Sequence, residues 1–125
     1  MASIENHLSI FKVVSKIGPD EIYHLASNSF VSYDFCDEES LISQNFNATH
    51  NLFSAAREIN PKCKIYFAGS SEMFGNPKES PQNETTPFHP RSVYGISKLA
   101  GFHLATNYRE NSGMHICTGI MFNHE

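Results

Sequence analysis

The chain has 125 residues, of which 40% are hydrophobic, and a formal net charge of −4 at pH 7. This length is enough for one small domain with one core. The nine lysines and arginines are scattered rather than clustered, which argues against a nucleic-acid partner. The sequence has no signal-peptide pattern and no apolar run of about 18 residues, so it supports neither secretion nor a membrane partner.

The cysteines and histidines indicate neither a disulfide framework nor a metal site. Cys36, Cys63 and Cys117 form no Cys-x-x-Cys pair and leave an odd number, as expected for reduced thiols in the cytoplasm. The seven histidines are dispersed, and none has the His-x-x-x-His or His-Glu-x-x-His spacing of zinc sites. We therefore expect a cytoplasmic protein without a metal ion.

Hydrophobic periodicity predicts three helices that alternate with three short strands. Helices are expected over residues 3–17, about 38–59 and 92 to about 110. Strands are expected over residues 21–26, 64–68 and 115–122. Ser3 is the expected cap of the first helix, Gly18-Pro19 ends it, and Gly113 ends the third. Residues 69–88 are expected to form a long loop, and loops of that length in compact domains are usually functional.

This order predicts an α/β fold, specifically a partial Rossmann-type doubly wound parallel sheet in which three strands alternate with helices. Strands separated by helices of this length form a parallel sheet with right-handed crossovers. Such sheets bind their ligands at the carboxyl ends of the strands. The loops that follow Leu25, Ala68 and Met121 all open on that edge, so we expect the functional site there.

Residues 91–98 hold the first candidate site, at the start of the third helix. Ser92 is placed to cap this helix, and Tyr94 and Lys98 share one of its faces because they are four residues apart. An ammonium beside a phenol favours the phenolate, which suits a group that takes a hydroxyl proton during hydride transfer. The same pair also fits an ordinary surface helix, and the Tyr-x-x-x-Lys spacing alone does not separate the two interpretations.

Residues 68–75 hold the second candidate site, directly after the second strand. Small residues there let a hydroxyl approach the Tyr-Lys helix closely. Ser70 is suited to donate a hydrogen bond to a substrate carbonyl, and Glu72 is suited to act as a carboxylate base. A simple turn with a solvated glutamate fits these residues as well.

Taken together, these segments resemble the GDP-mannose 4,6-dehydratase family of extended short-chain dehydrogenases/reductases. The resemblance covers nearly the whole chain and is carried by residues 19–26, 70–75, 84–95, 107–110 and 119–125. It implies a lyase that uses NADP to convert GDP-mannose to GDP-4-keto-6-deoxymannose. In that reaction C4 of the hexose is oxidised, a proton leaves C5 and water leaves from C6, and the hydride returns to C6.

The resemblance also implies roles for individual residues. Ser70 would hold the C4 oxygen, Tyr94 would be the base for the oxidation, and Lys98 would bind the nicotinamide ribose. Glu72 would remove the C5 proton and then protonate the departing hydroxyl. The implied cofactor contacts are Leu25, Ala26, Ser27, Asn28, Ser29, Tyr94, Lys98 and His124. The implied substrate contacts are Ser70, Glu72 and Asn123.

The residue before Glu72 bears on the alternatives within this superfamily. Nucleotide-sugar epimerases resemble the fold but generally lack a carboxylate at this position, and dTDP-glucose dehydratases have an Asp-Glu pair where this chain has Ser71-Glu72. The Ser-Glu pair favours the GDP-mannose branch. The alternatives are a related nucleotide-sugar reductase or epimerase, and a non-catalytic remnant or interaction module of the same fold.

Two parts of the family pattern have no counterpart in this sequence: the glycine-rich turn after the family's first strand, and the C-terminal half that holds the sugar nucleotide. We therefore expect residues 1–125 to be the central part of an NADP-binding Rossmann-like domain. We expect it to be inactive alone and the full-length protein to be a homo-oligomer. The strand at residues 21–26 would leave one edge unpaired, so we also expect the isolated chain to be poorly soluble, to self-associate or to need a partner fragment.

Overall fold

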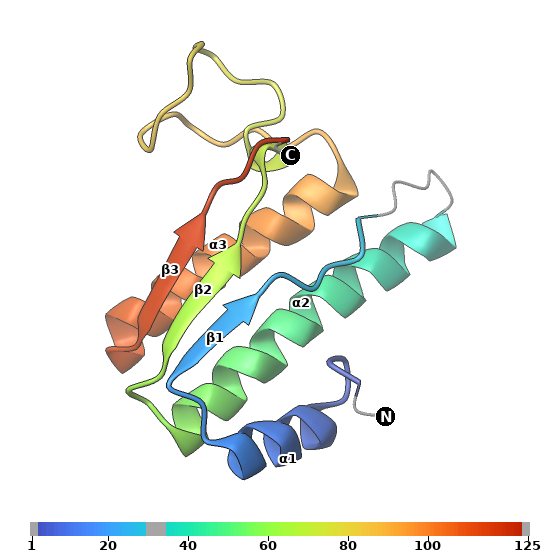
Figure 1. Ribbon diagram of the computed structural model, residues 1–125. Helices are drawn as coiled ribbons and strands as arrows, with labels where there is room; N and C mark the ends of the chain where they lie inside the picture. Colours follow the sequence, from blue (N-terminus) through green and yellow to red (C-terminus); the bar gives the residue numbers. More distant parts are fainter. Residues whose placement is uncertain (1–2, 30–34, 124–125) are drawn as a thin grey trace.

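The computed structural model describes residues 3–29 and 35–123 of the chain. Its helices are α1 (His7–Ile17), α2 (Phe35–Ile59) and α3 (Val93–Ser112), together with a one-turn 3-10 helix, η1 (Ser71–Met73). Its strands are β1 (Glu21–His24), β2 (Lys64–Ala68) and β3 (His115–Gly119). The strands lie parallel in the order β1-β2-β3 (Figure 1), so the predicted α/β fold with a parallel sheet is confirmed.

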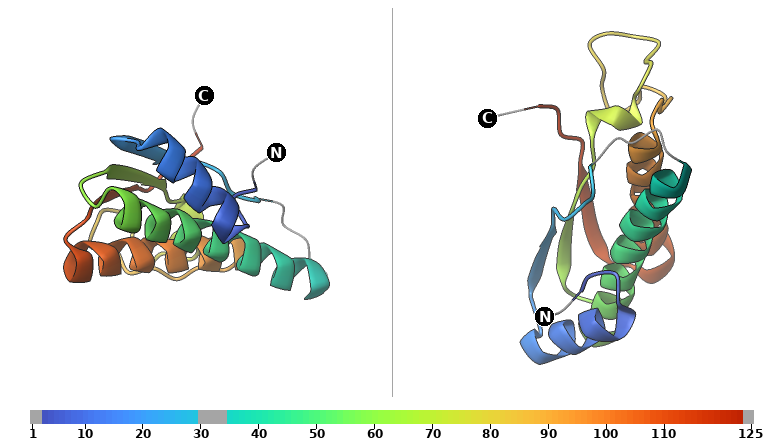
Figure 2. Two further views of the ribbon diagram at one scale, coloured as in Figure 1. Left: turned by 90° about the horizontal axis from the view of Figure 1, so that it is seen from below. Right: turned by 90° about the vertical axis from the view of Figure 1, so that its right-hand side faces the viewer.

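The structure has two layers, a sheet and the helices that cover one of its faces. α2 and α3 lie behind the sheet in the view of Figure 1, and α1 packs against α2 (Figures 1 and 2). The side chains of β2 alternate between the faces: Ile65 and Phe67 point toward the helices and are each 2% exposed, whereas Lys64 and Tyr66 lie on the other face. The main core cluster consists of Phe53, Ala56, Cys63, Ile65, Phe67, Ala105, Tyr108, Met114 and Ile116.

α3 approaches β2 closely because Gly101 has no side chain. A Cβ atom at this position would lie 2.4 Å from the Phe67 ring. That ring packs edge-on against Phe53 of α2, with 6.1 Å between the ring centroids, so a dense core keeps it from moving aside. The close approach brings the first half of α3 against the carboxyl end of β2.

The predicted cap of α3 and the two predicted glycine stops are confirmed. Ser92 caps α3, since its Oγ accepts a hydrogen bond from the backbone N–H of Gly95 at 3.0 Å. Gly18 follows α1 and Gly113 follows α3, both in the left-handed conformation, with φ of 57° and 64°. Glycine adopts this conformation without steric cost, which is why both helices end there.

The predicted start of the first helix is wrong. Asn6, not Ser3, caps α1: the Asn6 Oδ1 accepts a hydrogen bond from the backbone N–H of Ser9 at 2.9 Å. Asparagine caps helices at least as well as serine, and the Asn6 N–H bonds to the Ser3 carbonyl at 3.1 Å, which forms a turn before the helix. The long helix also begins earlier than predicted, at Phe35.

β1 and β3 end earlier than the predicted residues 26 and 122. The last pairs in the sheet are His24 with Phe67 and Gly119 with Ala68. After Ala68 the chain leaves β2 through Gly69 and turns into η1. The segment after β3 follows it through two single hydrogen bonds of 2.8 Å, from the Gly69 N–H to the Gly119 carbonyl and from the Ser71 N–H to the Met121 carbonyl. The residues that follow β1 and β3 therefore belong to the loops at the site edge.

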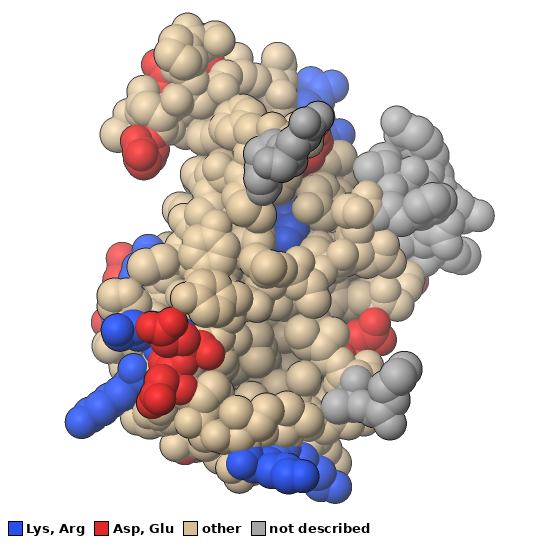
Figure 3. Space-filling view, in the orientation of Figure 1, with Lys and Arg blue, Asp and Glu red and all other residues tan. Residues whose placement is uncertain are grey.

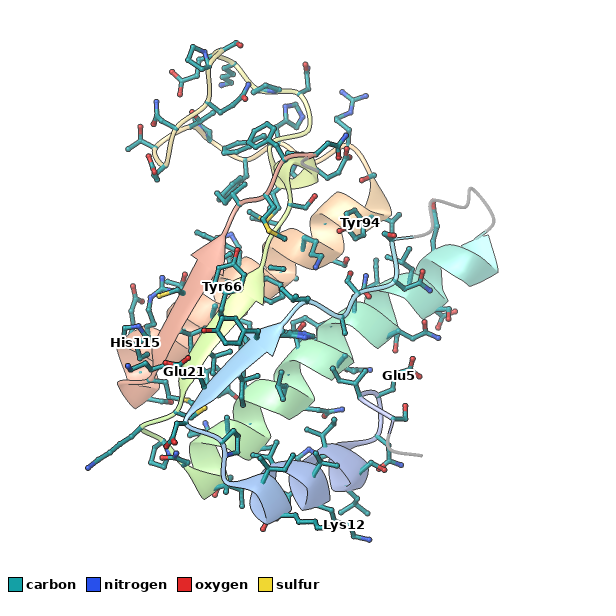
Figure 4. The ribbon with its side chains drawn as sticks, viewed as in Figure 1. Glu5, Lys12, Glu21, Tyr66, Tyr94 and His115 are labelled. Carbon is teal, nitrogen blue, oxygen red and sulfur yellow. The ribbon has the colours of Figure 1, made fainter. Side chains whose placement is uncertain are left out.

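No helix of the described residues covers the second face of the sheet (Figure 2). Tyr23 is 67% exposed on this face, and its ring centroid lies 6.3 Å from that of Tyr66. Figure 4 shows Tyr66, Glu21 and His115 together on this side of the sheet. Figure 3 shows that charged groups gather at the lower left of this face and that its middle is largely uncharged. On the same face, the Lys64 Nζ lies 3.9 Å from a Glu21 carboxylate oxygen. Parallel sheets are almost always covered on both faces, so this face, together with the outer edge of β1, is where we expect self-association.

We expect Tyr23→Lys to weaken self-association of the chain by about tenfold or more, because it replaces an aromatic ring on this face with a charged group that must lose its hydration when the surfaces meet. Leu8→Lys is the matched control, since Leu8 has the same 67% exposure but lies on α1. Sedimentation velocity over a range of chain concentrations measures the association. A chain that stays monomeric throughout, or two variants with equal effects, would contradict this expectation.

Candidate active site

The structure places four of the predicted site residues at the edge where the strands end. Ser70 and Glu72 lie at η1, directly after β2, and Tyr94 and Lys98 lie in the first turns of α3. Figure 4 shows Tyr94 at the start of α3, near the carboxyl ends of the strands. The segment 25–29, predicted to pass along a cofactor, follows β1 at the same edge.

Lys98 is buried at the contact between α3 and β2. Its side chain is 4% exposed, and its Nζ donates a hydrogen bond of 2.8 Å to the carbonyl of Ala68, the last residue of β2. The same Nζ lies 5.7 Å from the ring centroid of Tyr94 and 5.2 Å from that of Phe67, distances at which a cation is attracted to an aromatic face. Burial lowers the pKa of Lys98 to about 8. Tyr94 and Lys98 thus lie together, with the ammonium against the tyrosine ring.

Glu72 is exposed at the surface but held in place by two hydroxyl groups. The Ser70 Oγ accepts a hydrogen bond from the backbone N–H of Glu72 at 3.2 Å and thereby caps η1. The Ser92 Oγ–H donates to a Glu72 carboxylate oxygen at 3.2 Å. Because the same Ser92 oxygen accepts the N–H of Gly95, one hydroxyl joins the carboxylate to the start of the Tyr-Lys helix.

Gly95 sets the distance between η1 and α3. A Cβ atom at this position would lie 2.5 Å from the backbone carbonyl oxygen of Glu72, closer than any side chain can approach. Sequence reasoning assigned the close approach to small residues after β2 and did not identify Gly95. The sequence did contain a signal for this contact, because a glycine directly follows Tyr94 within the predicted helix. Glycine destabilises a helix by about 1 kcal/mol relative to alanine, so its presence there indicates a close contact.

The segment after β1 is anchored by the amide of Asn45, a buried residue of α2. The Asn45 Oδ1 accepts the backbone N–H of Asn28 at 2.8 Å, and the Asn45 Nδ2 donates to the Asn28 carbonyl at 3.0 Å. The same Nδ2 lies 3.1 Å from the Oγ of Ser97, and that hydroxyl donates to the carbonyl of Tyr94 at 2.8 Å. Sequence reasoning assigned no role to Asn45 or Ser97.

His24 is a second buried polar residue next to the site. It is 3% exposed, and its Nε2 lies 3.0 Å from the Thr49 Oγ1, which donates its hydrogen to the Asn45 carbonyl at 2.9 Å. Because the Thr49 hydroxyl has one hydrogen, His24 must carry its proton on Nε2 and donate it. Burial, and then the positive charge of Lys98, lower the pKa of His24 to about 4, so the ring is neutral at pH 7.

Other predicted site residues contribute less to this geometry. Asn123 is exposed after β3, and His124 lies outside the described residues.

Among the residues that the structure describes, no three histidine, cysteine or acidic side chains lie close enough to hold a metal ion. In the same part of the chain, no helix is long and apolar enough to cross a membrane.

A family model described as GDP-mannose 4,6 dehydratase matches residues 1–125. The chain belongs to this family. The membership confirms the resemblance carried by the segments around Ser70-Ser71-Glu72 and Tyr94. A GDP-mannose 4,6-dehydratase of Yersinia enterocolitica is 40% identical over 119 residues, which cover 94% of this chain and 32% of that relative. The chain therefore spans about a third of the length of the curated relatives that it matches.

Two solved structures support the Rossmann-type fold of this GDP-mannose 4,6 dehydratase family member. RMD from Pseudomonas aeruginosa, solved with NADPH, is 25% identical with a TM-score of 0.88, and the match covers 99% of this chain and 42% of that one. UDP-glucose 4-epimerase from Brucella ovis, solved with NAD, has the same TM-score at 23% identity and covers 97% of this chain and 37% of its own. The predicted Rossmann-type fold is confirmed.

We expect His24 to couple the stability of the chain to pH. Its pKa is about 4 in the folded chain and 6.5 without the protein environment, so the unfolded chain binds more protons between these two values. The free energy of unfolding should rise with pH across this window, and falling pH should remove up to about 3 kcal/mol. Urea unfolding at a series of pH values measures the slope.

Two variants isolate the contribution of His24 from that of the carboxylates. His24→Gln should flatten the pH dependence between about pH 4 and pH 6.5, because the amide does not titrate. His115→Gln, at an exposed histidine of β3, should keep the slope of the unmodified chain. Equal slopes for all three proteins would show that His24 is not the group responsible.

Proposed function

We propose that this chain is the central part of an NADP-dependent GDP-mannose 4,6-dehydratase and carries its acid–base residues. The observation that carries the proposal is the joining of the two predicted motifs: Ser92 connects Glu72 to the helix that holds Tyr94 and Lys98. Family membership supports GDP-mannose as the substrate and GDP-4-keto-6-deoxymannose as the product. Because the chain spans about a third of its curated relatives, we expect turnover only when the remaining parts are supplied.

The residues near Lys98 fit the nicotinamide end of a dinucleotide. An ammonium has three N–H donors, and the described contacts of Lys98 use one of them, on Ala68, which leaves donors for ribose hydroxyls. The segment after β1, from Leu25 to Ser29, lies at the same edge with most of its residues exposed, and it would line the cofactor's path. The glycine-rich turn that binds the pyrophosphate in this family has no counterpart before Gly18, so the proposal assigns only the nicotinamide side to this chain.

In the proposed mechanism, the bound nicotinamide supplies the hydride acceptor for C4 and the hydride donor for C6. Tyr94 removes the proton of the C4 hydroxyl, and the Lys98 ammonium, 5.7 Å from the centroid of the Tyr94 ring, places a positive charge beside this base. Ser70 donates a hydrogen bond to the C4 oxygen as it becomes a carbonyl. Glu72 then removes the C5 proton, which the C4 carbonyl has made acidic, and protonates the hydroxyl, which leaves C6 as water. When C6 regains the hydride, C5 takes up one proton, which balances the proton that Tyr94 removed.

We also propose that the full-length protein is cytoplasmic and homo-oligomeric. Free thiols at Cys63 and Cys117 support a reducing compartment. The uncovered sheet face supports further contacts, either with the rest of a longer chain or with another subunit. NADP, rather than NAD, is the cofactor that the family resemblance favours.

The uncovered face also favours a second candidate function, a non-catalytic interaction module of the same fold. Cofactor binding by the isolated chain separates the two. If the chain carries the nicotinamide side of the site, saturating NADP+ should raise its midpoint of thermal unfolding, because a ligand that binds only the folded state stabilises it. No shift with NADP+ or NAD+ would favour the interaction module.

Activity is best tested in a chimera in which this chain replaces the matching segment of the Yersinia enterocolitica relative. We expect Glu72→Gln to lower dehydration of GDP-mannose by about 100-fold or more while part of the C4 oxidation survives, because the amide cannot take the C5 proton. Tyr94→Phe should lower both steps. Product formation by NMR and single-turnover NADPH absorbance measure the two steps separately.

A matched control keeps this experiment interpretable. Glu58→Gln changes an exposed glutamate at the far end of α2 and should leave both steps unchanged. NADP+ binding by each chimera shows that it has folded. Equal loss of oxidation and dehydration in Glu72→Gln would contradict separate roles for Glu72 and Tyr94.

A further inference from the structure

Asn45 lies where three segments of the site meet, although it belongs to a helix that carries none of the predicted catalytic residues. Its amide pairs with both backbone groups of Asn28 and donates to Ser97, which in turn donates to the carbonyl of Tyr94. The contacts span 17 residues to Asn28 and 52 residues to Ser97. One side chain therefore connects the segment after β1 with the first turn of α3.

We propose that Asn45 is a positioning residue that holds the backbone at Asn28 and the Tyr94 turn at a fixed separation. The functional meaning rests on the proposed function, in which Asn28 lies on the cofactor side and Tyr94 is the base. Reacting groups must be held within a fraction of an ångström for efficient transfer, so an anchor between the two sides has a direct effect on rate. Asn45 acts through other residues and touches neither substrate nor cofactor in this assignment.

The donor and acceptor pattern of the site requires an amide. The Asn45 Oδ1 accepts one N–H, and the two hydrogens of its Nδ2 go to the Asn28 carbonyl and the Ser97 Oγ. A carboxylate of the same shape accepts the N–H but donates nothing, and it places negative charge beside the Asn28 carbonyl. A protonated carboxyl keeps one donor. Asn45→Asp therefore changes the hydrogen bonding with little change in shape, and the change depends on pH.

The backbone carbonyl of Asn45 is also hydrogen-bonded, by a side chain of its own helix. Thr49, one turn later on α2, donates to the Asn45 carbonyl and accepts from the buried ring of His24 at the end of β1. Such a bond from a threonine to the carbonyl four residues earlier restrains the local helix. The orientation of the Asn45 amide is therefore fixed by a turn of α2 that is hydrogen-bonded, through Thr49 and His24, to the end of β1.

Among the residues that the structure describes, four titratable residues lie around this network. They are His24 at the end of β1, Tyr94 and Lys98 on α3, and Glu5, which lines a hollow of about 130 Å³ together with Asn45. All four are shared by the variants below. Comparing each variant with the unmodified chain at the same pH therefore removes their contribution.

The test is hydrogen exchange of the Asn28 amide, followed by NMR in the isolated chain. In Asn45→Asp at about pH 8, the ionised carboxylate still accepts the Asn28 N–H, but it repels the Asn28 carbonyl and donates to neither that carbonyl nor Ser97. The segment should therefore detach more often, and we expect the Asn28 protection factor to fall about tenfold or more relative to the unmodified chain. As the new carboxyl gains its proton at lower pH, the loss should shrink, and it should follow the titration of that carboxyl's own NMR signal. Asn45→Leu, which has no polar group, should lose the protection at every pH.

Asn51→Asp is the matched control. Asn51 is also a buried asparagine of α2 and also donates to backbone carbonyls, but these belong to Ile4 and Glu5. It should loosen that segment and leave Asn28 protected. Asn28 protection within about twofold of the unmodified chain, in Asn45→Asp at about pH 8 or in Asn45→Leu, would overturn the proposal.

This experiment needs neither cofactor nor turnover, so its failure is distinguishable from failure of the proposed function. If the unmodified chain binds NADP+, the affinity of Asn45→Asp should fall in parallel with the Asn28 protection as pH rises, and that of Asn51→Asp should not. If the chain binds no NADP+, the proposed function fails while the exchange result still decides the role of Asn45.

Discussion

The arrangement of the site depends on how closely α3 approaches the end of β2. Two glycines of α3 permit this approach, Gly95 against the backbone of Glu72 and Gly101 against the ring of Phe67, where Cβ atoms would lie only 2.5 Å and 2.4 Å away. Lys98 lies between these two contacts in the sequence, so the approach that brings η1 to the helix also buries the lysine. The packing of α3 against β2 and η1 therefore determines the position of the Lys98 ammonium in the site.

Burying this ammonium has an energetic cost that the described surroundings offset only in part. The Ala68 carbonyl and the faces of Phe67 and Tyr94 stabilise it, but no ion pair joins Lys98 to a carboxylate among the described residues. Desolvation without a counter-ion costs several kcal/mol, which appears here as the lowered pKa of Lys98. The pKa of His24 is lowered first by the burial of its own ring and then by the positive charge of Lys98. The buried ammonium therefore places a positive charge without a carboxylate partner among the described residues of the candidate site.

Much of this arrangement follows from local pattern. The order of helices and strands, the Ser92 cap and the shared face of Tyr94 and Lys98 follow from periodicities of 3.6 and 2 residues and from side-chain capping, which act over a few positions. The cap of α1 was predicted wrongly because Ser3 and Asn6 are both good caps and only the turn between them decides. The contacts of Gly95 with Glu72 and of Asn45 with Asn28 join residues far apart in sequence, so only a folded backbone shows which of them meet.

The two sides of the candidate site are thus positioned by different physical means. Close contact at Gly95 and Gly101 sets the position of α3, and steric contacts of this kind change little with pH or salt concentration. Directional hydrogen bonds from the Asn45 amide set the place of the segment after β1, and these depend on the protonation and donor pattern of a few buried groups. The separation of the two sides is then determined by α2, the element between them. A substitution of Asn45 on this helix is therefore expected to alter the site geometry without removing any group that takes part in the chemistry.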